Sequence, residues 1–305
     1  MTTRSTMDLS SNQNGFAADY GRIQAQIRAE IERRSRVNTE TNTGPKLIPM
    51  DGSHAQRDSL VIIPTYNEAQ NIERLVPQVL AMGGFDVLVV DDDSPDGTGQ
   101  VADALAADLP GRVMVLHRRC KQGLGSAYLQ GFRTALRAGY AHVFQMDADF
   151  SHNPHYLPAL RAALNAADVI HGSRYVPGGG VRHWPLRRRI LSRVGSAYAA
   201  AVLGLPLCDV TSGFKGFTRR ALEALDFNRI QSAGFGFQIE VAYRCHQQGL
   251  HIVEAPIIFE ERQVGKSKMS GRIIAEALLM VWRVRFAHQR QGEKLPWLDS
   301  SGATQ

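Results

Sequence analysis

The sequence has few cysteines and no long hydrophobic run. Its three cysteines, Cys120, Cys208 and Cys245, are scattered, which is typical of a reducing compartment and gives no metal-ligand spacing. No stretch of about 18–20 uncharged apolar residues occurs, so a membrane-spanning helix is not expected. The polar N-terminal residues lack the apolar core of a signal peptide. Together these absences predict a cytoplasmic protein.

Two glycine motifs of nucleotide-binding folds are also absent. Gly123 and Gly125 precede a predicted helix, but Tyr128 stands where G-x-G-x-x-G requires its third glycine. No G-x-x-x-x-G-K-[ST] phosphate loop occurs either. A nicotinamide-dependent oxidoreductase is therefore disfavoured, and the two glycines are predicted to serve turn geometry and close packing.

The charge balance favours an anionic partner. The 305 residues carry a formal net charge of +6, which suits a nucleotide or a phospholipid surface. Base-reading motifs and clustered aromatic residues are missing, so nucleic acid is not predicted as a partner.

The chain divides into three parts. Residues 1–57 are predicted to be a disordered extension with one amphipathic helix near 20–34, where isoleucines recur at helical spacing. Residues 58–288 form one α/β domain, and 289–305 a disordered tail. Within the domain, predicted strands begin at or near residues 60, 85, 113, 142, 168, 214 and 252. Predicted helices span 68–82, 98–108, 125–138, 154–165, 186–203, 236–248 and 272–286. This alternation predicts a mainly parallel sheet covered by helices on both faces.

Polar clusters follow three of these strands, at 65–68, 91–93 and 147–149. Ligands of such sheets bind beyond the carboxyl ends of the strands. If the strand from His142 continues through Asp149, the side chains of Asp147 and Asp149 share one face, with Cα atoms about 6.5–7 Å apart. A divalent cation bridging a diphosphate would stabilise such a pair. The alternative is a solvated loop with two unrelated acids.

The other two clusters allow two interpretations each. Tyr66 could stack on a base and Glu68 could accept a hydrogen bond from a nucleoside, or Asn67 could simply cap the next helix. The acids at 91–93 could recognise a ribose or base or attract a cation. They could equally form a turn that caps the helix after them.

Basic groups follow later in the chain. Arg188 and Ser192 lie four residues apart near the start of a predicted helix, so they share a face and could bind a phosphate. A solvated basic face is the alternative. Arg262 and Lys268 flank a loop with glycine and serine that could close over a diphosphate as a lid.

Most of these residues occur within stretches that resemble family 2 glycosyltransferases of the GT-A fold, and more closely the polyprenol-phosphate (dolichol-phosphate) mannose synthases. The resemblance runs from about Ser59 to Phe286. Its matching stretches are 61–68, 89–98, 123–125, 146–152, 172–175, 209–215, 237–240 and 265–270. Three residues depart from the usual family pattern: Asp93, Lys215 and Lys266.

The resemblance implies a role for each matching residue. Asp149, Arg174 and Lys268 would be the catalytic residues, and Asp147 and Asp149 would bind Mg²⁺ or Mn²⁺. The nucleoside would be held by Pro64, Tyr66, Glu68, Val90 and Asp92, with the Ala148 backbone near the ribose. Arg174, Arg262 and Lys268 would contact the phosphates, Arg188 and Ser192 the lipid phosphate, and Gln238 and Glu240 the sugar.

The implied activity is inverting transfer of mannose from GDP-mannose to a polyprenyl monophosphate by a metal-dependent hexosyltransferase. UDP-glucose or another nucleotide sugar as donor, a non-lipid acceptor, and a non-catalytic nucleotide-sugar-binding subunit remain alternatives. A lipid acceptor further implies a peripheral site at the cytoplasmic membrane face, reached through the membrane surface or a membrane-anchored partner.

Overall fold

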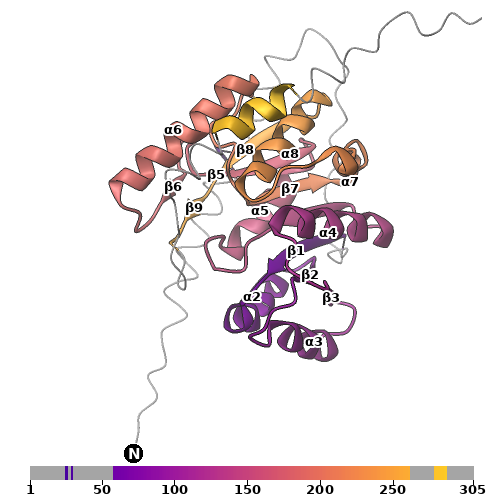
Figure 1. Ribbon diagram of the computed structural model, residues 1–305. Helices are drawn as coiled ribbons and strands as arrows, with labels where there is room; N and C mark the ends of the chain where they lie inside the picture. Colours follow the sequence, from indigo (N-terminus) through magenta and orange to yellow (C-terminus); the bar gives the residue numbers. More distant parts are fainter. Residues whose placement is uncertain (1–24, 27–28, 30–57, 262–277, 287–305) are drawn as a thin grey trace, which may run out of the picture.

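The computed structural model describes residues 25–26, 29, 58–261 and 278–286 (Figure 1). Of the helix predicted near 20–34, only residues 25–26 and 29 are described, and these are helical. Arg262, Lys268 and the predicted tail at 289–305 lie outside the described residues. The predicted boundaries of the three parts of the chain stay predictions.

A seven-stranded sheet forms the centre of the domain, in the order β3-β2-β1-β4-β7-β5-β8. Paired strands are parallel except at β7, which runs antiparallel to both β4 and β5. This confirms the predicted mainly parallel mixed sheet. The strands are β1 (Ser59–Thr65), β2 (Phe85–Asp91), β3 (Val113–His117), β4 (His142–Gln145), β5 (Val169–Ser173), β7 (Lys215–Thr218) and β8 (Ile252–Pro256). Two short strands, β6 (Gly180–Val181) and β9 (Ile258–Phe259), pair separately.

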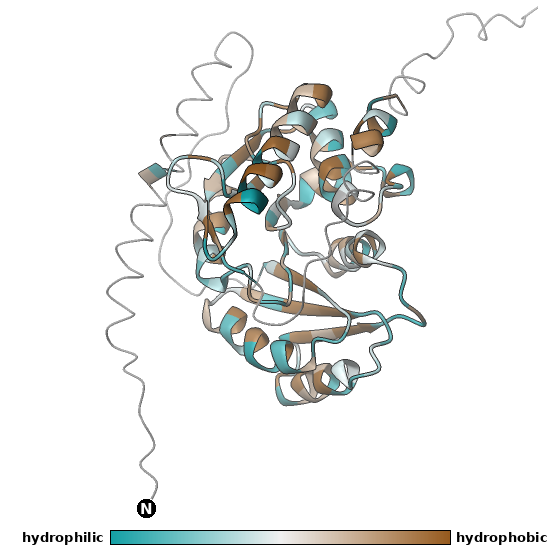
Figure 2. Ribbon diagram, turned by 60° about the vertical axis from the view of Figure 1, so that its left-hand side comes forward, coloured by the Kyte–Doolittle hydropathy of each residue, from teal (hydrophilic) through white to brown (hydrophobic). Residues whose placement is uncertain are grey.

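Helices cover both faces of the sheet, as the alternating strands require. Leu60 and Ile62 of β1 enter one core, and Val61 and Ile63 enter the other, because successive strand side chains point to opposite faces. Brown, apolar strands therefore lie between helices with teal, polar outer sides (Figure 2). One face carries α2 (Ala69–Ala81), α3 (Thr98–Asp108) and α5 (Leu157–Ala163). The other carries α4 (Leu124–Ala138), α6 (Leu186–Leu203), α7 (Arg219–Glu223), α8 (Phe235–Gln247) and the helical residues 278–286.

Two predicted strands and one predicted helix differ from the structure. The strand from His142 ends at Gln145: the Met146 N–H still donates to Ile62 O of β1, but the Asp147 N–H turns away and donates to His152 Nδ1, at 3.0 Å. The strand predicted from Ile252 to Phe259 stops at Pro256, opposite Ser173, where its partner β5 ends, and β9 pairs with β6 instead. The helix predicted from Pro154 begins as the 3₁₀ turn η1 (Pro154–Tyr156). A second such turn, η2 (Phe227–Arg229), was not predicted.

Side chains from several strands can meet at one edge of the sheet. The parallel strands end there, and antiparallel β7 begins there with Lys215, opposite Gln145 of β4 and His171 of β5. Within the described residues, no helix is long and apolar enough to cross a membrane.

Candidate active site

Asp147 and Asp149 lie in the turn just beyond β4, at the predicted strand end, and the strand does not continue through them. The Asp147 side chain is 28% exposed, whereas Asp149 is buried and accepts a hydrogen bond from the Ser151 N–H at 3.1 Å. The Tyr128 hydroxyl, from α4 below, donates to Asp147 Oδ1 at 3.3 Å. The pair thus occupies the predicted edge of the sheet, with Asp147 open to a ligand.

The two carboxylates create a negative potential that affects the pKa of the nearby Tyr128 hydroxyl. Burial and then the charge of Asp147 raise the pKa of Tyr128 well above its usual value, and Asp149 adds to the rise. No group of three or more His, Cys, Asp or Glu that could hold a metal occurs among the described residues. The two carboxylates are hard oxygen ligands of the kind that Mg²⁺ and Mn²⁺ take together with phosphate oxygens and water.

The turn after β1 presents Tyr66 to solvent at the same edge. Its ring is 37% exposed, and Lys121 Nζ lies 3.5 Å from the ring centroid. Asn67 adopts a positive φ of 62°, and Glu68 is the residue that precedes α2. Asn67 therefore does not cap that helix, and the capping alternative was wrong. Pro64 is partly exposed beside Tyr66.

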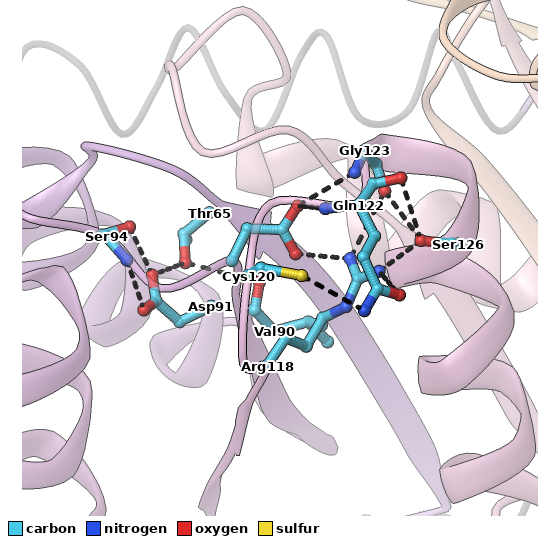
Figure 3. A network of polar contacts seen from close by, with 10 residues as sticks. Thr65, Val90, Asp91, Ser94, Arg118, Cys120, Gln122, Gly123 and Ser126 are labelled. Carbon is cyan, nitrogen blue, oxygen red and sulfur yellow. Dashed lines mark hydrogen bonds and ion pairs between the residues drawn. The ribbon is translucent and has the colours of Figure 1, made fainter.

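Asp91 and Asp92 have different side-chain partners, and Figure 3 shows Asp91 with Thr65 and Ser94. Asp91 Oδ1 accepts from the hydroxyls of Thr65 and Ser94, at 2.9 and 2.6 Å. Asp92 pairs with Arg118 and accepts from two backbone amides, Gln122 N and Gly123 N, at 3.2 and 3.1 Å. Asp92 thus fixes the loop 118–123 at the site.

Val90 has no exposed surface and packs in the core below α4. The structure gives its side chain a packing role. Gly125 also serves packing, since an added Cβ would lie 2.9 Å from the Phe237 ring. Gly123 has a φ of +90°, a turn conformation that L side chains rarely adopt. The prediction for these two glycines is confirmed.

Arg174 is held in a buried ion pair at the end of β5. Its Nε and Nη2 donate to the two carboxylate oxygens of Asp209, each at 2.7 Å, and Nη2 also donates to Thr211 Oγ1. Burial opposes the charge of each partner, but their attraction prevails: the pKa of Asp209 is lowered and that of Arg174 raised. Glu254 Oε1 accepts from the Asp209 N–H at 2.8 Å, which anchors the pair to β8.

Arg188 and Ser192 lie on α6 close to Arg174. The guanidinium carbons of Arg188 and Arg174 lie 4.0 and 5.7 Å from the Trp184 ring centroid. Both arginines therefore make cation–π contacts with the same indole ring. Arg188 also pairs with Glu261 at 2.9 Å. Ser192 Oγ accepts from the Tyr175 hydroxyl at 2.6 Å. The structure thus brings the predicted acceptor-phosphate residues together.

Gln238 and Glu240 begin α8 but have different surroundings. Gln238 is 2% exposed and receives two hydrogen bonds from Lys215. Glu240 pairs with Arg244 and accepts from the Ser232 N–H at 2.8 Å. Glu240 therefore holds the loop before α8, and its predicted contact with the sugar stays a prediction.

Sequence reasoning missed the partners that position these residues. Arg118, Trp184 and Asp209 stand in no motif that a charge or spacing argument singles out as a partner. His152 lies three residues after Asp149, and this closeness in the sequence was the one signal that could have identified it.

The fold and this edge together define a class, the nucleotide-sugar glycosyltransferases of the GT-A fold. Residues 60–226 match the family model of glycosyl transferase family 2, and the chain belongs to that family. Within the family it groups with the polyprenol-phosphate mannose synthases, which confirms the resemblance seen in the sequence.

Two curated relatives carry this grouping. The polyprenol monophosphomannose synthase of Mycolicibacterium smegmatis is 48% identical over 231 residues, covering 74% of this chain and 87% of the relative. The undecaprenyl-phosphate mannosyltransferase of Micrococcus luteus is 47% identical over 234 residues, covering 76% and 96%. Among solved structures, the mannosyltransferase PcManGT from Pyrobaculum calidifontis, in complex with GDP-Man and Mn²⁺, has a TM-score of 0.52 at 18% identity. That likeness covers 89% of this chain and 74% of the other, and it supports the fold.

Proposed function

We propose that this glycosyltransferase moves mannose from GDP-mannose to a polyprenyl monophosphate, with inversion at the anomeric carbon. The observation that carries the proposal is that the Asp147–Asp149 pair and the Arg174–Trp184–Arg188 cluster lie at one sheet edge. They are joined through two rings: the Asp147 N–H donates to His152, and Phe259 contacts both His152 and Trp184. Acids suit a metal-bound donor diphosphate, and guanidinium groups suit an acceptor phosphate. The names of the two bacterial relatives support the lipid acceptor, and the GDP-Man complex of PcManGT supports the donor.

A phosphate acceptor removes the need for a strong general base. The second pKa of a phosphate monoester is about 6, so the nucleophile is already anionic at neutral pH. The chain then has to align the two substrates and balance their charge. Asp147 and Asp149 would hold Mg²⁺ or Mn²⁺. The ion would supply positive charge to the departing diphosphate.

The two arginines differ in how firmly they are held. Arg174 and Asp209 are both almost inaccessible, with side-chain exposures of 7% and 0%, so Arg174 is a fixed positive charge. Arg188 and Glu261 are 25% and 40% exposed, and such pairs contribute only about 0–1 kcal/mol. An acceptor phosphate can therefore displace Glu261 from Arg188. Contacts of Arg262 and Lys268 with the phosphates belong to the proposal on the resemblance alone.

A donor panel tests the proposed reaction. Radiolabelled GDP-mannose, GDP-glucose and UDP-glucose are each incubated with a polyprenyl phosphate and Mg²⁺ or Mn²⁺, and the organic phase is counted. Label from GDP-mannose alone is expected. Label only from UDP-glucose would overturn the donor, label only in a water-soluble product would overturn the acceptor, and binding without turnover would indicate a non-catalytic subunit.

A lipid acceptor requires a membrane contact, and one surface of the molecule suits it. Nine large hydrophobic side chains are exposed among the described residues, and eight of them lie on α6 and the adjoining helical residues 278–286. The Tyr198 hydroxyl donates to Leu278 O at 3.4 Å, so the two helices lie side by side. The eight residues are Leu186, Ile190, Leu191, Val194, Leu278, Leu279, Trp282 and Phe286. We call them the apolar face.

Positive charge accompanies the apolar face. Arg187, Arg189 and Arg193 are exposed on α6, and guanidinium groups attract anionic lipid headgroups. The acceptor-binding Arg188 and Ser192 lie on the same helix. The apolar face would therefore rest on the cytoplasmic membrane surface and bring the site to the phosphate of the lipid.

Vesicle sedimentation tests this contact. Ile190→Asp with Val194→Asp removes two side chains that are 56% and 59% exposed, and roughly tenfold or weaker binding to anionic phospholipid vesicles is expected. Ala104→Asp, on exposed α3 at the other end of the molecule, is the matched control (Figure 1). Transfer to a short, water-soluble polyprenyl phosphate should persist in all variants. Unchanged vesicle binding by the double variant would exclude the apolar face.

A further inference from the structure

A lysine buried below the site has no role in the proposed reaction. Lys215 opens β7 with no exposed surface. Its Nζ donates to Gln238 Oε1 at 2.5 Å and to Gln238 O at 3.0 Å. Both bonds reach one residue of α8, so Lys215 links the sheet edge to the first turn of that helix.

These bonds fix which end of the Gln238 amide faces the site. Below a pH of about 7 the Lys215 side chain is an ammonium group, which can only donate, so it meets the carbonyl end of the amide. The NH₂ end then points away from Lys215. Gln238 Nε2 is buried and has no hydrogen-bond partner among the residues that the structure describes. A buried donor without a partner is unfavourable by about 1–3 kcal/mol, which an acceptor atom of a ligand would remove.

The space before Gln238 Nε2 adjoins the acid pair. A Cβ added at Gly213 would lie 3.5 Å from Gln238 Nε2 and 3.6 Å from Asp147 Oδ2. It would also lie 3.4 Å from His152 Cε1. Because Gly213 has no side chain, a space of about one methyl group remains between Gln238 Nε2 and Asp147 Oδ2, enough for a single hydroxyl oxygen of a ligand. A hexose attached to a diphosphate at Asp147 would come within reach of this amide.

We propose that Lys215 is a positioning residue that orients the Gln238 amide so that its N–H groups donate to a hydroxyl oxygen of the donor hexose. Without Lys215, the amide can rotate by half a turn and present its oxygen, since the two ends are nearly equal in size. The inference rests on the proposed function for the identity of the sugar. It extends that function by naming the group that sets sugar recognition.

The ratio of the affinity for GDP-mannose to the affinity for GDP measures the contribution of the sugar contact to binding. Isothermal titration with Mn²⁺ gives this ratio for the wild type and for Lys215→Met, which keeps the length of the side chain but donates nothing. The ratio should fall about five- to tenfold, the equivalent of one lost hydrogen bond, while the affinity for GDP alone stays unchanged. Lys215→Arg retains a donor and should restore most of the ratio.

Two further variants keep the test decisive. Gln238→Glu accepts from Lys215 but presents oxygen instead of N–H, so it should lose the sugar contribution even with Lys215 in place. Gln145→Met is the matched control, because Gln145 is equally buried, faces Lys215 across the β4–β7 pairing and has no hydrogen bond to Gln238. It should leave the ratio unchanged.

The outcomes separate this inference from the proposed function. A wild-type ratio in folded Lys215→Met, or in Gln238→Glu, would overturn the positioning role. If the wild type binds another nucleotide sugar instead, the donor assignment fails, and the same ratio measured with that sugar still tests Lys215. If Lys215→Met does not fold, Gln238→Glu alone decides.

Discussion

Removal of Asp209 tests the buried ion pair most directly. Asp209 accepts from the Arg174 guanidinium at two positions and from the Arg174 backbone N–H at 3.0 Å. Among the described residues, Asp209→Ala therefore leaves a buried cation with Thr211 as its remaining hydrogen-bond partner. Asp209→Asn keeps the size of the side chain and removes only the charge, so it separates the loss of charge from the loss of packing.

The expected loss is large because both partners are buried. Breaking a buried pair by removing one member lowers the free energy of unfolding by about 3–5 kcal/mol, out of a total of about 5–15 kcal/mol for a domain. Urea titration followed by circular dichroism at pH 7 measures it as a shift of the midpoint at constant slope. A loss below about 0.5 kcal/mol in Asp209→Ala, in the range of ordinary surface substitutions, would refute the reasoning.

The double variant and pH add two checks. Arg174→Met with Asp209→Leu removes both charges and should recover most of the stability, yet remain inactive if Arg174 positions the acceptor. The lowered pKa of Asp209 means that its contribution is complete above the unfolded value of 3.8 and is lost as pH falls through the folded value. The difference between wild type and Asp209→Ala should therefore shrink below about pH 4.

Three other predictions concern the same edge of the sheet. Asp149→Asn should abolish transfer with an unchanged circular dichroism spectrum, and full turnover of that variant in excess EDTA would exclude the metal role. Burial lowers the pKa of Lys215 to about 7 from 10.5, so between these pH values the unfolded chain binds more protons than the folded one. The free energy of unfolding should therefore rise with pH in this window. Urea midpoints should show a smaller rise in Lys215→Met. Gly216→Ala places a Cβ 2.6 Å from the Phe144 ring and should lower the free energy of unfolding by about 1–3 kcal/mol, and a midpoint equal to the wild type would contradict the packing.

The sequence predicts the layers of this fold well, because hydrophobic periodicity reports burial directly. Helices 98–108 and 186–203 have the predicted bounds. It fails where one side chain redirects the backbone. His152 Nδ1 accepts a hydrogen bond from the Asp147 N–H, and β4 ends early. Hydrophobic periodicity does not reveal a hydrogen bond to a histidine in a loop.

The site was only partly predictable for a similar reason. Arg174 was identified by its place in a motif, but its partner Asp209 lies 35 residues later and meets it only in the folded chain. Asp92 was predicted to face the nucleoside, which stays a prediction, but its contacts with Arg118 and the loop amides were not foreseen. The type of a charged residue indicates that it needs a partner, and the tertiary structure decides which one.

The insertion of antiparallel β7 between β4 and β5 has a consequence for synthesis of the chain. Strands β1 to β4 leave the ribosome first, but the outer side of β4 pairs with nothing until Lys215–Thr218 follow. During that interval a nascent chain exposes an open strand edge, a known template for aggregation. Truncation before residue 215 would make that exposure permanent. Pairing of β7 therefore covers the exposed edge of β4 and, in the same step, joins the β4 and β5 ends of the site.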